Sequence, residues 1–116
     1  IVFVVSLASF DEHLFEDGSI NSLLDSLECF RETINHEALL WSERLPLFLV
    51  LNKTDSFRRK ITKKSLKECF ADDEQYEYDE NVYFHECEDD EEKVRRNTDF
   101  IRQLFVDQVQ PTVRDG

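Results

Sequence analysis

Glycine is almost absent from this chain of 116 residues, which contains only Gly18 and Gly116. A phosphate-binding loop of the form Gly-x-x-x-x-Gly-Lys-Ser/Thr uses glycines so that backbone N–H groups can surround a phosphate. Neither this pattern nor an Asp-x-x-Gly magnesium motif occurs anywhere in the sequence. Hydrolysis of a nucleoside triphosphate needs a phosphate cradle, Mg²⁺ and an oriented water. The residues for these tasks are therefore absent from this segment.

Long apolar runs and an excess of positive charge are also missing. No apolar stretch approaches the roughly 20 residues that span a membrane, and the N-terminus lacks the charged-then-apolar pattern of a secretory signal. Lys and Arg number 14 against 26 Asp and Glu, which gives a net charge of −12. Nucleic acid is an improbable partner on this composition, because its phosphates are bound by Lys and Arg.

Cysteine is present in an odd number without paired spacing, as Cys29, Cys69 and Cys87. Such cysteines are typical of reduced thiols in a cytosolic protein and not of a disulfide framework. His85 and Cys87 lie close together in sequence, but two ligands do not make a site that normally needs four. We therefore predict no metal site in this segment.

The first half of the chain predicts a strand, a helix and a second strand. Residues 1–7 are nearly all apolar, as in a parallel strand that is covered on both faces, and residues 45–51 form a similar run. Between them, apolar residues recur at helical spacing from Ile20 to Ile34, and Ser19 is a candidate N-cap. A βαβ unit of this kind indicates an α/β fold with parallel strands and flanking helices.

The second predicted strand leads directly into Asn52-Lys53-Thr54-Asp55. Ligands of open α/β sheets bind beyond the carboxyl ends of the strands, and the chemistry of this tetrad suits guanine. The Asp55 carboxylate can accept two hydrogen bonds from adjacent N–H groups, and the Asn52 amide can donate to a ring nitrogen or carbonyl. The Lys53 stem can lie along a flat base while its charge stays in water. The alternative is a simple turn, which Asn and Asp also favour, although the buried-type strand before the tetrad argues for a site.

Further segments match one known family in order, namely residues 1–11, 15–21, 27–36, 60–70 and 100–105. Together with residues 47–55 they resemble the α subunits of heterotrimeric G proteins, and the match is loose between Ala71 and Thr98. The resemblance implies a partial P-loop NTPase (Ras-like) three-layer fold that is truncated at both ends. It places a partial GTPase domain at residues 1–110, with an acidic insertion at about 71–92 and a tail at 111–116.

The same resemblance implies a function in signal transduction from G protein-coupled receptors. It assigns GTP or GDP binding to Asn52, Lys53 and Asp55, and expects Mg²⁺ in the intact protein with no ligand in this segment. The implied partners are a βγ dimer, a receptor, and an effector that contacts the loop at 36–45, where Trp41 is either an exposed anchor or a core residue. The implied location is the cytoplasm, at the inner face of the plasma membrane.

A second hypothesis from a different class stays open. The chain could be a truncated, non-catalytic paralogue that acts only as a protein-interaction module. A phosphate-binding loop encoded upstream of Ile1 would favour the GTPase, and its absence would favour the interaction module.

The second half of the chain changes charge sign along its length. Residues 56–70 are basic around Ile61, Leu66 and Phe70, which predicts a solvated amphipathic face or a patch for anionic lipid or an acidic partner. Residues 71–92 are strongly acidic and predict a solvated, mobile insertion. Val94, Ile101, Leu104 and Phe105 then mark a last helix that ends before Pro111.

Overall fold

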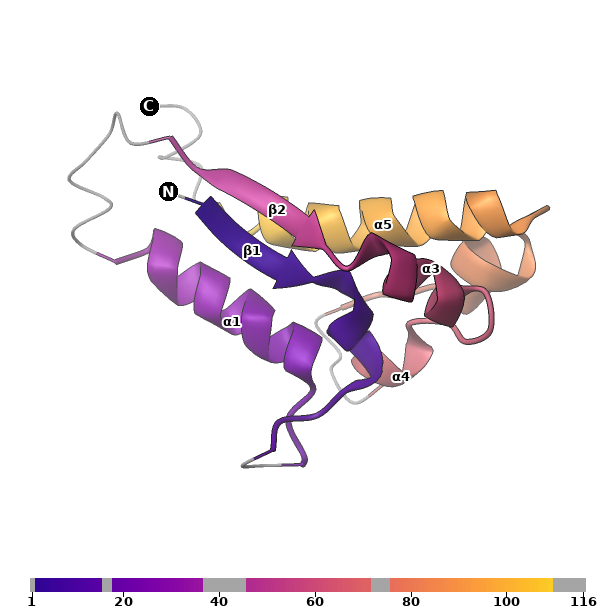
Figure 1. The fold of residues 1–116 in the computed structure, drawn as a ribbon, viewed down its shortest axis with the longest axis horizontal. Coiled ribbons are helices and arrows are strands. Elements are labelled where there is room, and N and C mark those ends of the chain that lie inside the picture. The colour runs from indigo at the N-terminus through magenta and orange to yellow at the C-terminus, as the bar shows by residue number, and fades with distance from the viewer. Residues whose placement is uncertain (1, 16–17, 37–45, 72–75, 110–116) are drawn as a thin grey trace.

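A computed structural model describes residues 2–15, 18–36, 46–71 and 76–109, and shows an α/β arrangement (Figure 1). The predicted effector loop from residue 37 onward, with Trp41, and the tail at 111–116 lie outside the described residues. The elements follow in the order β1 (Val2–Ser6), the 3-10 helix η1 (Leu7–Asp11), α1 (Ser22–Ile34), β2 (Phe48–Asn52), α3 (Thr54–Ile61), α4 (Lys67–Phe70), the π-helix η2 (Asn81–His85) and α5 (Asp90–Val106).

Strands β1 and β2 are parallel neighbours, in a register that pairs Val2 with Phe48 and Ser6 with Asn52. Helix α1 lies between them in the chain and provides the crossover that parallel strands require. The predicted strand, helix and strand are therefore confirmed. Because the strands run the same way, both carboxyl ends, Ser6 and Asn52, lie at one edge of the sheet.

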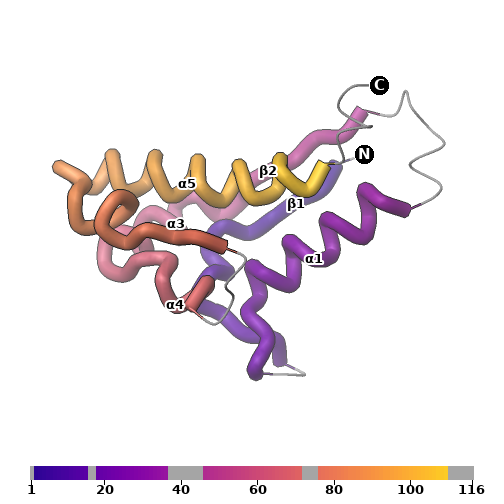
Figure 2. Tube along the Cα trace, turned by 180° about the vertical axis from the view of Figure 1, so that it is seen from behind, coloured from indigo at the N-terminus to yellow at the C-terminus, as the bar shows by residue number. Residues whose placement is uncertain are grey.

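Helix α5 passes behind the sheet in Figure 1 and in front of it in Figure 2, and α1 runs alongside β1. Helix α1 contacts both β1 and α5. Phe30 of α1 joins the two layers, since its ring meets that of Phe3 at 5.0 Å and that of Phe105 at 5.3 Å, both edge to face. Such aromatic pairs are favourable beyond the area they bury. Fully buried Val5 completes this side of β1.

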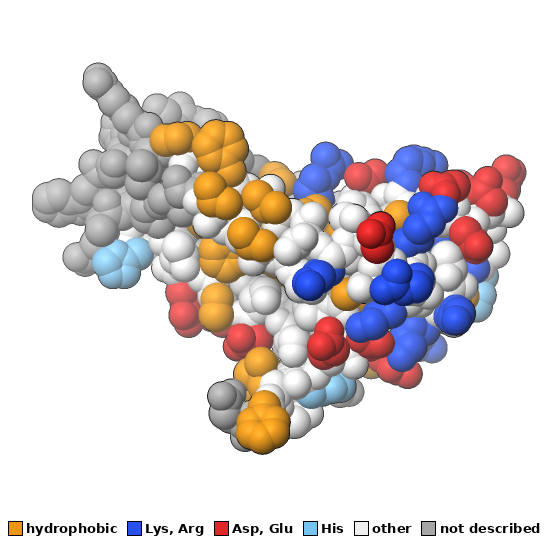
Figure 3. Space-filling view, in the orientation of Figure 1, with side chains coloured by type: hydrophobic (Ala, Val, Ile, Leu, Met, Phe, Trp, Pro, Cys, Tyr) orange, Lys and Arg blue, Asp and Glu red, His pale blue; other side chains and the backbone are white. Residues whose placement is uncertain are grey.

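The opposite face of the sheet is bare in the described part of the chain. Val2, Val4, Phe48 and Val50 are 62%, 56%, 58% and 42% exposed, and they form the apolar band visible in Figure 3. Strand side chains alternate between faces, so these residues point away from α1 and α5. The prediction that both faces are covered is therefore wrong for the described residues, which form two of the three expected layers.

Helix α1 begins differently from the prediction that placed Ser19 at its N-cap. The cap is Asn21, whose Oδ1 accepts from the backbone N–H groups of Leu23 at 2.9 Å and Leu24 at 3.2 Å. Its Nδ2 also donates to the carbonyl of Phe10 at 2.6 Å. Asparagine prevails here because its amide can cap the helix and hold η1 at the same time.

The acidic insertion is more ordered in its packing than the sequence predicts. Tyr76 and Tyr78 pack against the core, and the ring of Tyr78 stacks on that of Tyr83 at 5.2 Å. The acidic run near residue 90 begins α5, where Asp89 accepts from the N–H of Glu92 at 2.8 Å. Acidic residues are favourable in a first helical turn, so part of this charge serves local structure. No acidic residue of 76–92 is buried, as the solvated interpretation predicts, but Tyr76 and Tyr78 pack against the core, which the charge pattern did not predict.

Asn97 fixes this insertion to α5 from a fully buried position. Its Oδ1 accepts from the hydroxyl of Tyr78 at 2.6 Å, and its Nδ2 donates to the carbonyls of Tyr83 at 2.8 Å and Lys93 at 2.7 Å. Burial raises the pKa of Tyr78 to about 12, so the phenol stays protonated as a donor.

Among the described helices, none is long and apolar enough to cross a membrane.

Candidate functional site

The predicted tetrad lies at the carboxyl edge of the sheet, where β2 ends and α3 begins. Asn52 is the last residue of β2, Lys53 is the N-cap of α3, and Asp55 lies in the first turn of that helix. Lys53 has φ 60° and ψ 40°, the left-handed conformation, and is the only described non-glycine residue with positive φ. This conformation costs about 1–2 kcal/mol for a residue with a Cβ. Strain of this kind is found preferentially at functional sites.

The side chains of the tetrad have no partners within the described part of the chain. Asn52, Lys53 and Asp55 are exposed, and no side-chain hydrogen bond or ion pair joins any of them to another described residue. Lys53 caps α3 only through its backbone, because its carbonyl accepts from the N–H of Phe57 at 2.9 Å. The amide, ammonium and carboxylate groups are therefore available to an external ligand.

The backbone that carries these side chains is held by the core. Phe57 and Ile61 of α3 are fully buried, and the ring of Phe57 meets that of Phe10 edge to face at 5.7 Å. Phe10 belongs to η1, which follows β1. The two segments that continue from the carboxyl ends of the strands are thus packed against each other, and this packing fixes the start of α3.

An ion-pair cluster forms a second link between the same segments. Lys60 of α3 donates to the carbonyl of Ala8 and to Asp11, each at 2.7 Å, and Lys64 reaches the other oxygen of Asp11 at 3.3 Å. Burial of the Asp11 carboxyl opposes its ionisation, but the hydrogen bonds and charges of Lys60 and Lys64 outweigh burial and lower the pKa of Asp11. Unlike an exposed pair, this cluster includes a carboxylate only 15% exposed.

Asp11, Lys60 and Asn21 hold the segments around the site together, and none of these contacts was predicted from the sequence. The available signal was local: Asp11 follows the first apolar strand, and Asn21 precedes the first periodic apolar residues. Nothing in the sequence indicated that Lys60, distant in the chain, would be the partner of Asp11.

The basic segment is partly neutralised within the chain. Lys60 and Lys64 pair with Asp11, and Arg58 pairs with Glu91 of α5. Helix α3 nevertheless turns Phe57 and Ile61 inward and leaves Arg58 and Arg59 exposed, as the amphipathic interpretation predicts. Figure 3 shows acidic side chains interspersed among the basic ones, so this face offers no uniform positive patch.

The geometry defines an α/β protein in which a strained polar loop at the carboxyl edge of parallel strands has no side-chain partner in the described part of the chain. Residues 1–115 match the family model described as G-protein alpha subunit. The chain therefore belongs to the G-protein alpha subunit family, whose members bind guanine nucleotides.

Individual relatives agree with this assignment. The chain is 40% identical to the guanine nucleotide-binding protein alpha-7 subunit of Dictyostelium discoideum over 72 residues, covering 62% of this chain and 18% of the relative. The alpha-8 subunit of the same organism is 44% identical over 72 residues, which cover 62% of this chain and 17% of that relative. The alpha-3 subunit of Caenorhabditis elegans is 26% identical over an alignment of 126 residues, which covers 91% of this chain and 35% of that relative. The chain thus spans at most about a third of the length of these relatives.

Proposed function

We propose that this chain supplies guanine recognition to a G-protein alpha subunit, with Asn52, Lys53 and Asp55 as the residues that contact the base. Asp55 accepts hydrogen bonds from the two adjacent N–H groups of guanine, Asn52 donates to an acceptor on the opposite edge, and the stem of Lys53 covers one face of the ring. Adenine lacks that adjacent donor pair, so Asp55 selects against it.

The observation that carries this proposal is that the side chains of the tetrad have no partner among the described residues, on a backbone that the core holds in place. Preorganised polar groups bind a ligand without first breaking internal hydrogen bonds or ordering a loop. The left-handed conformation at Lys53 adds support, because backbone strain of this kind is found preferentially at functional sites.

Because the chain belongs to this family, we also propose a function for the whole protein. The complete polypeptide would bind GTP or GDP with Mg²⁺, and would act as a signal transducer with a βγ dimer, a receptor and an effector at the inner face of the plasma membrane. This segment contains no phosphate-binding loop, so by itself it binds guanine weakly and does not hydrolyse GTP.

The test is to titrate the chain with GMP and, separately, with AMP. The amide chemical shifts in an NMR spectrum are measured at each concentration. GMP should shift the amides of residues 52–57 with a dissociation constant of about 1–10 mM, which corresponds to about 3–4 kcal/mol of binding free energy. AMP should leave these amides unchanged at the same concentrations.

A matched pair of variants locates the effect. Asp55→Ala should abolish the shifts caused by GMP, while Asp79→Ala removes a carboxylate elsewhere and should preserve them. Equal responses to GMP and AMP, or a response to GMP that survives Asp55→Ala, would contradict the proposal.

A further inference from the structure

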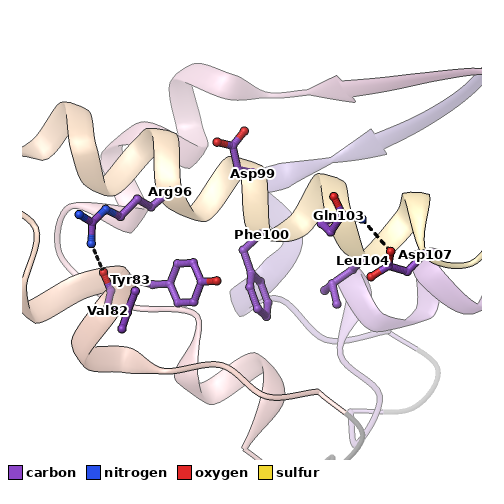
Figure 4. Close-up of a pocket in the computed structure, with 8 residues that line it drawn as sticks. All are labelled: Val82, Tyr83, Arg96, Asp99, Phe100, Gln103, Leu104 and Asp107. Atoms are coloured by element: carbon purple, nitrogen blue, oxygen red, sulfur yellow. Dashed lines mark hydrogen bonds between the residues drawn. The ribbon is translucent and has the colours of Figure 1, made fainter.

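A groove separate from the tetrad lies between η2 and the middle of α5 (Figure 4). It encloses about 470 Å³. Val82 and Tyr83 line it from η2, and Phe100 and Leu104 line it from α5. Cavities that bind ligands or anchor side chains are commonly of this size and equally apolar.

The apolar floor of the groove is fixed by contacts behind it. The ring of Tyr83 meets that of Phe100 edge to face at 5.0 Å and stacks on that of Tyr78 at 5.2 Å. The carbonyl of Tyr83 accepts from buried Asn97 at 2.8 Å. The floor is therefore anchored to one face of α5, through Asn97 and Phe100, before any ligand side chain arrives.

The rim of the groove is acidic. Asp99 and Asp107 contribute carboxylates to its lining. Asp99 pairs with Arg102 at 3.1 Å, and Asp107 accepts from Gln103 at 2.7 Å. Exposed pairs such as Asp99–Arg102 contribute little free energy, so an added cation can still reach these carboxylates. The cation of the lining, Arg96, donates to the carbonyl of Val82 at 2.6 Å and pairs with Glu92. The bond from Arg96 to Val82 is visible in Figure 4. Over residues 76–109 the sequence has eleven Asp and Glu against four Lys and Arg. A surface with this excess attracts cations and repels anions.

We propose that this groove docks a segment of a partner protein in which an apolar anchor side chain is flanked by Lys or Arg. The anchor would fill the space over Tyr83 and Phe100, and the flanking cations would meet Asp99 and Asp107. A second copy of this chain is a poor occupant, because its net charge of −12 would bring like charges together.

The first experiment measures fluorescence anisotropy of a labelled peptide of alternating Leu and Lys as the whole chain is added. Saturable binding that weakens as salt is raised is expected, since exposed charge pairs are screened. A peptide in which Glu replaces Lys should not bind. If the two peptides bind equally well, the groove selects apolar groups alone and the proposed partner chemistry is wrong.

A matched pair of valines tests the location. Val82 of η2 lines the groove and is 39% exposed. Val106 of α5 is 40% exposed and does not line the groove. Val82→Ser should weaken the Leu–Lys peptide about five- to tenfold, because it removes buried apolar surface, and Val106→Ser should have no effect. Equal effects of the two substitutions would overturn the placement.

A second pair of variants, which remove charges, tests the same groove if Val82→Ser fails to fold. Asp99→Asn with Asp107→Asn should weaken the peptide and flatten the salt dependence. Glu32→Gln with Glu68→Gln removes the same charge elsewhere and should change neither. Asp55→Asn should leave peptide binding intact, so failure of guanine recognition and failure of this docking site are distinguishable.

Discussion

The polar side chain of Asn97 and those at and just after the end of β2, Asn52 and Asp55, differ in whether they hydrogen-bond to other described residues. The amide of Asn97 is fully buried and makes three hydrogen bonds, to Tyr78, Tyr83 and Lys93. The side chains of Asn52 and Asp55 are exposed and make none with described residues. Both asparagines lie on regular elements, Asn97 inside α5 and Asn52 at the carboxyl end of β2, where the side chain faces solvent.

The comparison separates structural polar groups from those available to a ligand. A buried polar group must be paired because leaving it unpaired costs free energy, and no buried side-chain nitrogen or oxygen in the described residues lacks a partner. The groups at the end of β2 are under no such constraint, since water satisfies them. Removing them should therefore affect ligand binding and leave folding intact, whereas removing Asn97 should do the opposite.

The largest expected effect is on stability at Asn97. Asn97→Ala removes the acceptor of the Tyr78 hydroxyl, which keeps only the bond from the N–H of Leu66 at 3.3 Å. It also removes the amide donor to the carbonyl of Tyr83 and opens a small cavity. The free energy of unfolding, measured with urea, should fall by about 2–4 kcal/mol. Asn52→Ala is the matched control and should change it by less than about 0.5 kcal/mol. A comparable loss in both variants would remove the distinction between the two asparagines.

A smaller effect is expected at the link between α3 and η1. Lys60→Met removes hydrogen bonds to Ala8 and Asp11 and should cost about 1–3 kcal/mol in urea unfolding. Lys63→Met, at an exposed neighbouring position, should cost much less. If Lys60 and Lys63 prove equivalent, the cluster around Asp11 does not support the site.

The same link predicts a dependence on pH. Because the pKa of Asp11 is lower in the folded state than its ordinary value of 3.8, its contribution to stability is complete above that value. The contribution is lost as the pH falls through the lower folded pKa. The stability advantage of the unmodified chain over Lys60→Met should therefore shrink on acidification below about pH 4. An advantage that stays constant down to pH 2 would contradict this.

The smallest expected effect is at Lys53. Lys53→Gly relieves the cost of the left-handed conformation but frees the unfolded chain, so the free energy of unfolding should rise by about 0.5 kcal/mol or stay unchanged. Guanine binding should weaken at the same time, because the stem over the base is lost. A loss of stability without a loss of binding would show that the strain at Lys53 has a structural role.

The sequence predicted the βαβ unit and the position of the tetrad because both depend on local patterns. Continuous apolar runs indicated β1 and β2, and the spacing of Leu23, Leu27 and Phe30 indicated α1. The match of residues 1–115 to the G-protein alpha subunit family confirms the family that those motifs resembled.

What the sequence could not predict depends on contacts between distant segments. The cap at Asn21 is favoured over Ser19 through its bond to Phe10, and Lys60 is linked to Asp11 from across the chain. The acidic density of residues 76–92 predicted solvation, which holds for the acidic side chains, but it did not reveal that half-buried Tyr78 donates to buried Asn97. The apolar composition of β1 did not reveal that one face of the sheet would be bare in the described residues.

The central claim is that Asp55 selects guanine, and the most direct measurement is a change of base preference. Asp55→Asn replaces two acceptors by one donor and one acceptor, which suits the carbonyl of xanthine in place of the amino group of guanine. The measurement compares the dissociation constants of GDP and XDP for this chain joined to the phosphate-binding half of an alpha subunit. The unmodified protein should prefer GDP, and Asp55→Asn should lose about 1.5–3 kcal/mol of GDP affinity and prefer XDP. An unchanged preference for GDP in Asp55→Asn would contradict the account.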